Sequence, residues 1–386
     1  MARILLLTHE FEPFRGGIAA VADGLALGAA SAGHAPIVLA PDYGARHEES
    51  DRDRPYAVHR FPGSTCSMVS MDGLVRFTKL CSREIQQTQA DVIHAVDPPS
   101  QMALTMLARF RRVDTYFFTV HGTELTRYRD ELLPRLWMGR GLRRATSIHA
   151  VSRAVYRLLP ADGLSAPRHA FVEPPGIRRT WLDQPAADRT AVRAQWGANE
   201  TDLVLLTLAR RVPEKGQAEV IAAVAQLPDA LRHRIVYVIA GHGPEDYART
   251  LEQSAHAAGV RIVLTGSITD EAAIAACDGA DLFVMLSRMT HKRLEGFGIA
   301  YIEAGSRGLP SLARETGGVA EAVLHGETGI VVPHGADSTV IGRALDTLLR
   351  DPSERSRLGA RARAHASDFA WESRARAVYD RFLGRL

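Results

Sequence analysis

The feature that most constrains the fold is a repeated alternation of short apolar runs with helical or loop stretches. Apolar runs bounded by polar residues or glycine are typical of strands in a parallel sheet, and the stretches between them are long enough for crossover helices. The first series comprises 3–8, 36–40, 91–96, 115–120, 147–151 and 170–172, and the second comprises 203–208, 235–240, 261–264, 282–286, 310–313 and 329–332. The pattern predicts an α/β chain with two parallel sheets.

Two sheets imply two domains, and a chain of 386 residues with 46% hydrophobic content can bury two cores. The alternation breaks over 181–201, which we interpret as the hinge. The expected units are a first domain over 1–186, a second over 187–366 and a terminal helix over 367–386. Ser367 and Asp368 favour the start of that helix because their side chains can cap it, and its aromatic residues suit docking on the first domain.

The composition limits the classes of function. The 47 basic and 44 acidic residues leave a net charge of +3, too balanced to indicate a nucleic-acid-binding protein. The three cysteines form no CxxC pair and no metal-ligand spacing, which fits a reducing cytoplasm. The first apolar run meets polar residues too early for a signal peptide, and no uncharged apolar segment is long enough to span a membrane. We expect a cytoplasmic protein.

Two glutamates dominate the second half of the chain. Glu303 lies in an apolar helical stretch, where an ionised carboxylate is costly unless something binds it. Glu295 precedes it by eight residues and is followed by glycines, which allow a backbone to approach a ligand closely. If a helix begins near Gly298, both carboxylates face one cleft and the N–H groups of the helix start face an anion. The arrangement suits a molecule with hydroxyls at both ends and phosphates between them, as in a nucleotide-sugar.

Two cations flank a predicted strand-to-helix turn. Arg210 and Lys215 follow the strand 203–208 and precede a stretch of helical periodicity, so both can converge on a diphosphate at the helix start. A solvated loop is the alternative interpretation of such a pair. Lys215 is one of only three lysines among 47 basic residues, which favours a chemical role for it.

Further loops follow predicted strands, where parallel sheets bind ligands. Gly16 and Gly17 lie between the strand 3–8 and a helical pattern, a geometry that can present N–H groups to phosphate, although a Gly-Gly pair is also an ordinary turn. His121 comes directly after the strand 115–120, and a satisfied core or loop histidine is equally compatible with that position. Glycine turns also follow later strands at Gly241, Gly266 and Gly317.

Two charged segments have competing interpretations. Asp51 and Asp53 form a D-x-D pair of the kind that can hold a divalent metal, but no strand leads into their charged loop, and we interpret them as solvated. The segment 127–144 carries six arginines interleaved with leucines and a tryptophan. A basic amphipathic helix of this kind can lie on an anionic membrane, and a solvated helix is the alternative.

Together these pieces resemble the retaining glycosyltransferases of family four, which adopt the GT-B fold. The motifs span nearly the whole chain, and the most specific is Glu-x7-Glu with its Gly-Phe-Gly, formed by 295–303. The others are Gly16-Gly17, His121-Gly122, 210–216, 241–244, Thr265-Gly266, 317–321, 326–329 and 369–371. The chain departs from the family at Ala209, where glycine is common, and at Arg211, where an apolar residue is usual.

The resemblance implies two Rossmann-like domains facing a deep interdomain cleft, with the terminal helix crossing back to the first domain. The first domain would bind the acceptor and the second the nucleotide-sugar donor. Glu303 would accept hydrogen bonds from the ribose. Glu295 and His121 would lie at the transferred sugar and are the expected catalytic side chains together with two cations.

Those cations, Arg210 and Lys215, would neutralise the donor diphosphate, so the same resemblance implies largely electrostatic catalysis. The other donor contacts would fall mostly on backbone groups, with the base near residues 266–268. The residues concerned are Gly16, Gly17, Gly266, Ile268, Phe297, Gly298 and Ile299.

By resemblance, the reaction moves a sugar from a nucleotide-diphosphate sugar to a hydroxyl acceptor with retention at the anomeric carbon. It is a front-face displacement without metal or other cofactor. A UDP-sugar such as UDP-GlcNAc or UDP-glucose is the preferred donor, and GDP-mannose is the alternative. An epimerase on the same fold and a non-catalytic nucleotide-sugar-binding protein are competing interpretations. The acceptor is a small molecule, a lipid or a glycan, as in secondary-metabolite or glycoconjugate biosynthesis.

Overall fold

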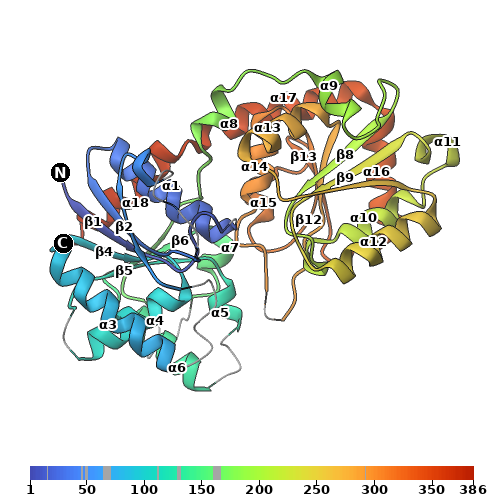
Figure 1. Cartoon of the computed structure of the whole chain (residues 1–386). Helices are drawn as coiled ribbons and strands as arrows, with labels where there is room; N and C mark the ends of the chain where they lie inside the picture. Colours follow the sequence, from blue (N-terminus) through green and yellow to red (C-terminus); the bar gives the residue numbers. More distant parts are fainter. Residues whose placement is uncertain are drawn as a thin grey trace. The chain divides into compact units, whose positions relative to one another are not determined.

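Two parallel sheets form the framework of the chain, each at the centre of its own unit (Figure 1). The computed structural model describes residues 1–14, 16–44, 47, 51–63, 71–110, 113–127, 132–159, 167–291 and 293–386. Unit 1 comprises Met1–Gly176, His291–Phe297 and Phe369–Leu386, and unit 2 comprises Ile177–Thr290 and Gly298–Asp368. The predicted α/β architecture with two Rossmann-like domains is confirmed.

Unit 1 is built on a seven-stranded parallel sheet with the strand order β3-β2-β1-β4-β5-β6-β7. The strands are β1 Arg3–Leu7, β2 Ala35–Pro41, β3 Ala57–Phe61, β4 Val92–Ala95, β5 Phe117–Val120, β6 Ser147–Ala150 and β7 Ala170–Val172. The helices are α1 Gly17–Ser31, α3 Met71–Thr88, α4 Pro98–Arg109, α5 Thr123–Arg127, α6 Leu132–Arg144, α7 Arg153–Tyr156 and α18 Trp371–Leu383. Strands covered by helices on both faces need apolar side chains on both, which explains the short continuous apolar runs.

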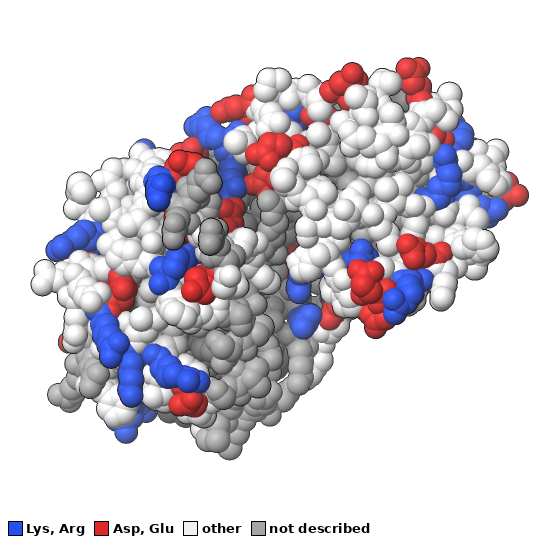
Figure 2. Space-filling view, viewed as in Figure 1, with Lys and Arg blue, Asp and Glu red and all other residues white. Residues whose placement is uncertain are grey.

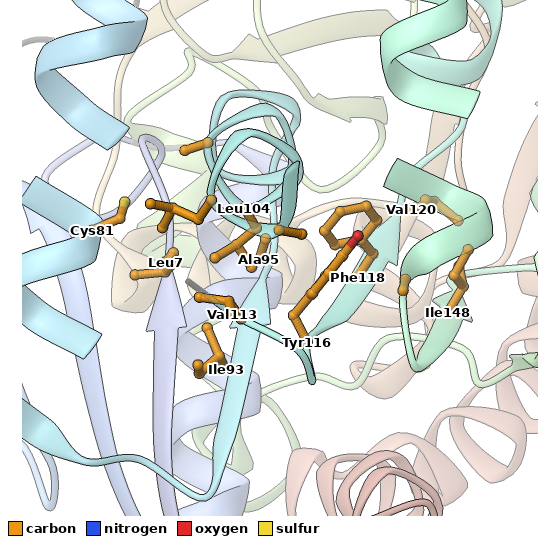
Figure 3. Close-up of a cluster of buried hydrophobic side chains, with 14 of the residues drawn as sticks. Leu7, Cys81, Ile93, Ala95, Leu104, Val113, Tyr116, Phe118, Val120 and Ile148 are labelled. Atoms are coloured by element: carbon orange, nitrogen blue, oxygen red, sulfur yellow. The ribbon is translucent and has the colours of Figure 1, made fainter. Parts of the chain in front are cut away.

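One core of unit 1 lies between this sheet and the helices α3, α4 and α6 (Figure 3). Leu7, Ile93 and Phe118 project from three strands into the cluster, where Cys81 of α3 and Leu104 of α4 meet them (Figure 3). All five side chains are buried. Burying one such large apolar side chain contributes about 1.5–3 kcal/mol, so this cluster holds the strands whose ends carry the candidate residues.

The edge strand β3 is not predicted from the sequence. Its residues, Ala-Val-His-Arg-Phe, include two polar side chains, and only Phe61 among them is buried. An edge strand has a neighbour on one side only, and this one is half-covered, so it needs no continuous apolar run. It pairs in parallel with β2.

The C-terminal helix α18 packs against α1 within unit 1, and glycines permit the close approach. A Cβ atom built on Gly24 would lie 1.9 Å from Cε2 of Trp371. A Cβ atom on Gly28 would lie 2.5 Å from Cβ of Ala375. Larger residues at either glycine would force the two helices apart.

The start of α18 differs from the expectation that Ser367 and Asp368 cap it. Both residues lie in a 3-10 turn, and the residue at the N-cap position is Ala370, which makes no side-chain capping hydrogen bond. Phe369 and Trp371 are both buried on either side of it. Burial of these two rings, rather than a cap, decides where the helix begins.

Unit 2 is built on a six-stranded parallel sheet with the order β10-β9-β8-β11-β12-β13. The strands are β8 Leu203–Leu208, β9 Ile235–Ala240, β10 Arg261–Gly266, β11 Leu282–Met285, β12 Ser311–Arg314 and β13 Gly329–Val332. The helices are α8 Arg179–Asp183, α9 Arg189–Ala194, α10 Gln217–Val224, α11 Asp229–Arg232, α12 Glu245–Ala258, α13 Asp270–Gly279, α14 Ile299–Ser306, α15 Val319–Ala322, α16 Ser338–Arg350 and α17 Pro352–Ala366. A second core lies between the sheet and α10, α12, α16 and α17.

The stretch 181–201, interpreted above as a hinge, folds within unit 2. Helix α8 contacts α14, and α9 contacts α13. Arg307 anchors the stretch, because its buried guanidinium pairs with Asp278 at 2.9 Å and donates to the carbonyl of Gln184 at 2.8 Å. The contacts therefore divide the chain at Gly176–Ile177, before the expected boundary at 186/187.

Candidate functional site

The candidate residues of unit 2 lie at the ends of strands of one parallel sheet, or on the loops and the helix that follow those ends, so they share one edge of the sheet. Arg210 and Lys215 follow β8, Gly266 ends β10, and Glu303 lies on α14 after β11. Strand β8 is hydrogen-bonded to both β9 and β11. The cation loop and the segment that leads to α14 are therefore neighbours at this edge.

The loop after β8 turns its first arginine, Arg210, outward and the next one, Arg211, inward. Arg211 is buried and donates hydrogen bonds to the carbonyl of Gly243 at 3.2 Å and to Glu245 at 3.0 Å. The Arg210 side chain is exposed, and within the described part of the chain it forms no hydrogen bond or ion pair. Arg211, the departure from the family pattern, thus holds the loop, which leaves Arg210 available to an anion.

Lys215 is half-buried at the end of the 3-10 turn Pro213–Lys215, directly before Gly216. Gly216 has φ 76°, and a Cβ atom on it would lie 2.3 Å from the carbonyl oxygen of Leu286. Only glycine suits this position, because the left-handed backbone and the close approach both exclude a side chain. The Arg288 N–H donates to the carbonyl of Glu214 at 2.8 Å and joins the two loops a second time.

An ion-pair network supports this edge, and it is not predicted from the sequence. Glu219 on α10 accepts from Arg314 at 2.6 Å and also pairs with Arg288. Both arginines lower the pKa of the Glu219 carboxyl, although its partial burial opposes them. A charged residue on a helix usually indicates a solvated face, so the sequence offers no signal for this contact.

Glu303 is half-buried on α14, and its helix starts at Gly298, which has the left-handed backbone angles φ 92° and ψ 60°. Burial raises the pKa of Glu303 to about 8, and the Asp270 carboxylate adds to the effect while Arg178 opposes it. Asp270 and Arg178 pair with each other at 2.7 Å. Among the residues that the structure describes, none forms a hydrogen bond or ion pair with the Glu303 carboxylate. A ligand with hydroxyl donors can supply the missing partners.

Gly266 closes β10 with φ 69°, and its carbonyl accepts a hydrogen bond from the Gly241 N–H at 2.8 Å. Gly241, at the end of β9, lies so close to β8 that a Cβ atom on it would be 2.0 Å from the carbonyl oxygen of Ala209. Ile268 is half-buried two residues after Gly266. Two of the three glycine turns predicted at the strand ends, those at Gly241 and Gly266, thus pack against each other in unit 2.

In unit 1, the turn between β1 and α1 presents Gly16 and Gly17. Gly16 takes the N-cap position with an extended backbone, and no side chain caps the helix. A Cβ atom on Gly17 would meet nothing within 4 Å, so open space lies in front of the first turn of this 15-residue helix. The N–H groups of that turn can face an anion.

His121 follows β5, as predicted, and its position is held by hydrogen bonds on both sides. Its Nε2–H donates to the carbonyl of Val96 at 2.8 Å, which fixes the orientation of the ring. Its backbone N–H donates to the Glu124 carboxylate at 2.5 Å. Glu124 is 1% exposed, and burial raises its pKa. Sequence reasoning missed Glu124, although a glutamate in the first turn of a helix often reaches back to a preceding N–H group.

Glu295 and Phe297 belong to unit 1, whereas Gly298, Ile299 and Glu303 belong to unit 2. Glu295 is half-buried, and Phe297 is buried with its ring centroid 5.7 Å from that of Phe369. The specific Glu-x7-Glu motif is therefore divided between the two units. Unit 1 holds His121 and Glu295, and unit 2 holds the two cations and Glu303.

In the charged segment with Asp51 and Asp53, the Asp51 carboxylate is paired with arginines. The Asp51 carboxylate accepts two hydrogen bonds from Arg60, at 2.8 and 2.9 Å, and a third charge, Arg54, lies at 3.5 Å. Its oxygens are therefore engaged by guanidinium groups. Across the described ranges, no group of three or more potential metal-binding side chains occurs.

The basic segment 127–144 forms α6 over Leu132–Arg144, and 128–131 lies outside the described residues. Met138 and Leu142 are buried, whereas Leu136 is 56% exposed. Basic and acidic side chains are interspersed on the face of the molecule shown in Figure 2. No helix in the described part of the chain is long and apolar enough to cross a bilayer.

Both halves of the chain match models of glycosyltransferase families. Residues 15–180 match the family model Glycosyltransferase Family 4, and residues 188–365 match the model Glycosyl transferases group 1. The GDP-mannose-dependent alpha-(1-6)-phosphatidylinositol monomannoside mannosyltransferase of Mycolicibacterium smegmatis is 31% identical over 395 residues, which cover 99% of this chain and 98% of the relative.

Two further proteins show a more limited likeness. The D-inositol 3-phosphate glycosyltransferase of Streptomyces bingchenggensis is 33% identical over 201 residues, or 51% of this chain and 44% of the relative. The crystal structure of Anabaena HepE in complex with UDP and glucose has a TM-score of 0.81 and 19% identity, and the match covers all of both chains. At that identity the likeness shows the GT-B fold alone.

Proposed function

The chain belongs to the family 4 glycosyltransferases and is a nucleotide-sugar-dependent hexosyltransferase, and we propose that it transfers mannose from GDP-mannose to a hydroxyl of phosphatidylinositol or its monomannoside. The observation that carries this proposal is the 31% identity, over nearly the full length of both chains, to a GDP-mannose-dependent mannosyltransferase. That relative favours GDP-mannose, the alternative donor of the sequence analysis, over the UDP-sugar preferred there.

In unit 2 the donor's nucleotide occupies the strand ends described above. Glu303 accepts hydrogen bonds from the ribose hydroxyls. This assignment is supported by its half-buried carboxylate, which has no hydrogen-bond or ion-pair partner among the described residues. Arg210 and Lys215 neutralise the diphosphate, with the N–H groups of Gly298 and Ile299 at the start of α14. The base rests against 266–268.

In unit 1, His121 and Glu295 contact the mannosyl group, and Gly16 and Gly17 contact phosphate oxygens. The anomeric carbon–phosphate bond breaks with its electron pair on the leaving phosphate, and the acceptor oxygen bonds to the anomeric carbon from the same face. The leaving phosphate oxygen takes the acceptor's proton. Because the acceptor attacks from the face that the phosphate leaves, the configuration is retained. Preorganised cations that stabilise the leaving diphosphate supply most of the rate enhancement, without a metal.

A lipid acceptor implies that the protein works at a membrane surface. Arginines and an exposed Leu136 on α6 supply the two elements of such contact, charge for anionic headgroups and an apolar side chain for the interface. This placement extends the expectation of a cytoplasmic protein with peripheral membrane contact.

The test is a transfer assay with purified protein. GDP-mannose, UDP-glucose and UDP-GlcNAc are each supplied with vesicles that contain phosphatidylinositol or its monomannoside, with and without EDTA, and products are identified by mass spectrometry. A mannosylated lipid formed only from GDP-mannose and unaffected by EDTA is the expected result. Transfer from a UDP-sugar alone contradicts the donor assignment, and a changed sugar without transfer indicates an epimerase.

Inositol phosphate is a second candidate acceptor, favoured by the 33% identity to a D-inositol 3-phosphate glycosyltransferase over about half of this chain. The same assay with free inositol 3-phosphate in place of vesicles separates the two acceptors. Glycosylation of the water-soluble acceptor and not of the lipid supports this second candidate.

A further inference from the structure

The segment His291–Phe297 has an unusual place in the fold. It connects β11 to α14, two elements of unit 2, but its contacts assign it to unit 1. It carries Glu295, one of the two acids of the Glu-x7-Glu motif. The side chains and backbone on either side of Glu295 show how unit 1 holds it.

Leu294, directly before Glu295, packs against the core of unit 1. A Cβ atom built on Gly122 would lie 3.1 Å from Cδ2 and 3.3 Å from Cδ1 of Leu294. Both methyl groups of Leu294 thus cover Gly122, where the His121 loop has no side chain. Gly122 has φ 102°, a backbone conformation that suits glycine.

Gly296, directly after Glu295, touches the same loop. A Cβ atom on Gly296 would lie 2.6 Å from the carbonyl oxygen of His121 and 3.4 Å from Cγ2 of Val151. A contact of 2.6 Å is too short for a carbon atom, so any residue larger than glycine would push the segment off the His121 backbone. Glu295 is therefore held between two anchors on the pair His121-Gly122.

We infer that Leu294 and Gly296 are positioning residues that seat Glu295 against the His121 loop, so that unit 1 presents both side chains to the transferred sugar as one preorganised pair. The inference rests on the proposed function, in which these two side chains contact the sugar. The pair is rigid from both sides, because His121 is itself held by Glu124 and Val96. Displacement of such a group by about 1 Å can lower a rate by about 100-fold.

The test compares Leu294→Ala and Gly296→Ala with matched controls. Leu80→Ala removes the same atoms from another half-buried leucine on the same core, and Gly335→Ala adds a methyl group in open space. Two quantities are measured for each variant: kcat/KM for GDP-mannose, and the dissociation constant of GDP, which lacks the sugar. Melting temperatures verify that every variant is folded, and Leu294→Met tests rescue by a side chain of similar volume.

We expect both seat variants to lose about 10- to 100-fold in kcat/KM while their GDP affinity stays unchanged, because only contacts to the sugar are displaced. Leu294→Met should recover most of the loss, and both controls should resemble wild type. Wild-type kcat/KM in the seat variants overturns the inference, and so does an equal loss of GDP affinity or an equal loss in the controls. If wild type transfers no sugar from any donor, the proposed function fails instead. The positioning of Glu295 is then tested by the affinity of GDP-mannose relative to that of GDP. This ratio should fall in Leu294→Ala and Gly296→Ala, and an unchanged ratio overturns the inference.

Discussion

Binding of the nucleotide should release a proton, and the source of that proton should be Glu303. Burial raises the pKa of this carboxyl to about 8 in the free protein. The ribose hydroxyls donate hydrogen bonds to the ionised form, so the bound state favours the carboxylate and lowers its pKa. Binding and ionisation are then linked, and the size of the linkage follows from the pKa of the free protein.

At pH 7 a group with a pKa of about 8 is ionised in only about a tenth of the molecules. The apparent dissociation constant of GDP should therefore fall about tenfold between pH 7 and pH 9 and level off above that. Close to one proton should be released per GDP bound at pH 7. In Glu303→Gln neither effect remains, and at pH 9 the variant should bind more weakly by about 1.5–3 kcal/mol, the usual contribution of a hydrogen bond to a charged group.

Isothermal titration calorimetry in two buffers of different ionisation enthalpy measures the proton release directly. Glu252→Gln on α12 removes an exposed carboxyl and serves as the control, which should keep the wild-type behaviour. An absence of proton release in wild type refutes the reasoning, and so does the same pH dependence in Glu303→Gln. Either result would mean that the Glu303 carboxylate does not meet the ribose.

The same pKa has a consequence for stability. It lies above the ordinary value of 4.5, so between pH 4.5 and about 8 the folded chain holds a proton that the unfolded chain has released. The free energy of unfolding should fall as pH rises through this range, by up to about 1.4 kcal/mol per pH unit. Glu303→Gln should remove that slope in urea unfolding measured across the range.

Three other predictions concern the cations, a buried histidine and the terminal helix. Arg210→Ala and Lys215→Ala should each lower kcat by about 100- to 1,000-fold, and wild-type turnover would remove either from the site. His149 has a pKa of about 4 because it is buried, so stability should fall as pH drops from 6.5 towards 4, and His149→Gln should reduce that loss in urea unfolding. Gly24→Ala should cost about 1–3 kcal/mol in thermal unfolding, because its methyl group would collide with Trp371, and an unchanged melting temperature would contradict the packing of α18 on α1.

The strand pattern of both sheets is predictable from the sequence because it depends on burial of near neighbours. Strand β9, and β1 from Ile4 onward, are covered on both faces and carry an unbroken apolar run. The edge strand β3 has no such run, because half of it faces solvent, and only its pairing with β2 makes it a strand. Likewise, the start of α18 depends on where Phe369 and Trp371 are buried rather than on a capping side chain.

The same distinction holds for the candidate site. Chemical type and spacing in the sequence determined which residues to consider, since an acid in an apolar helix and a rare lysine beside a glycine turn are unusual wherever they fold. Only the tertiary structure decided that Arg210 faces outward while Arg211 is buried, and that Glu295 is held by unit 1 through contacts with His121 and Gly122. The physical reason is that these contacts join residues far apart in the chain, and their distances depend on how whole loops pack, which no local pattern records.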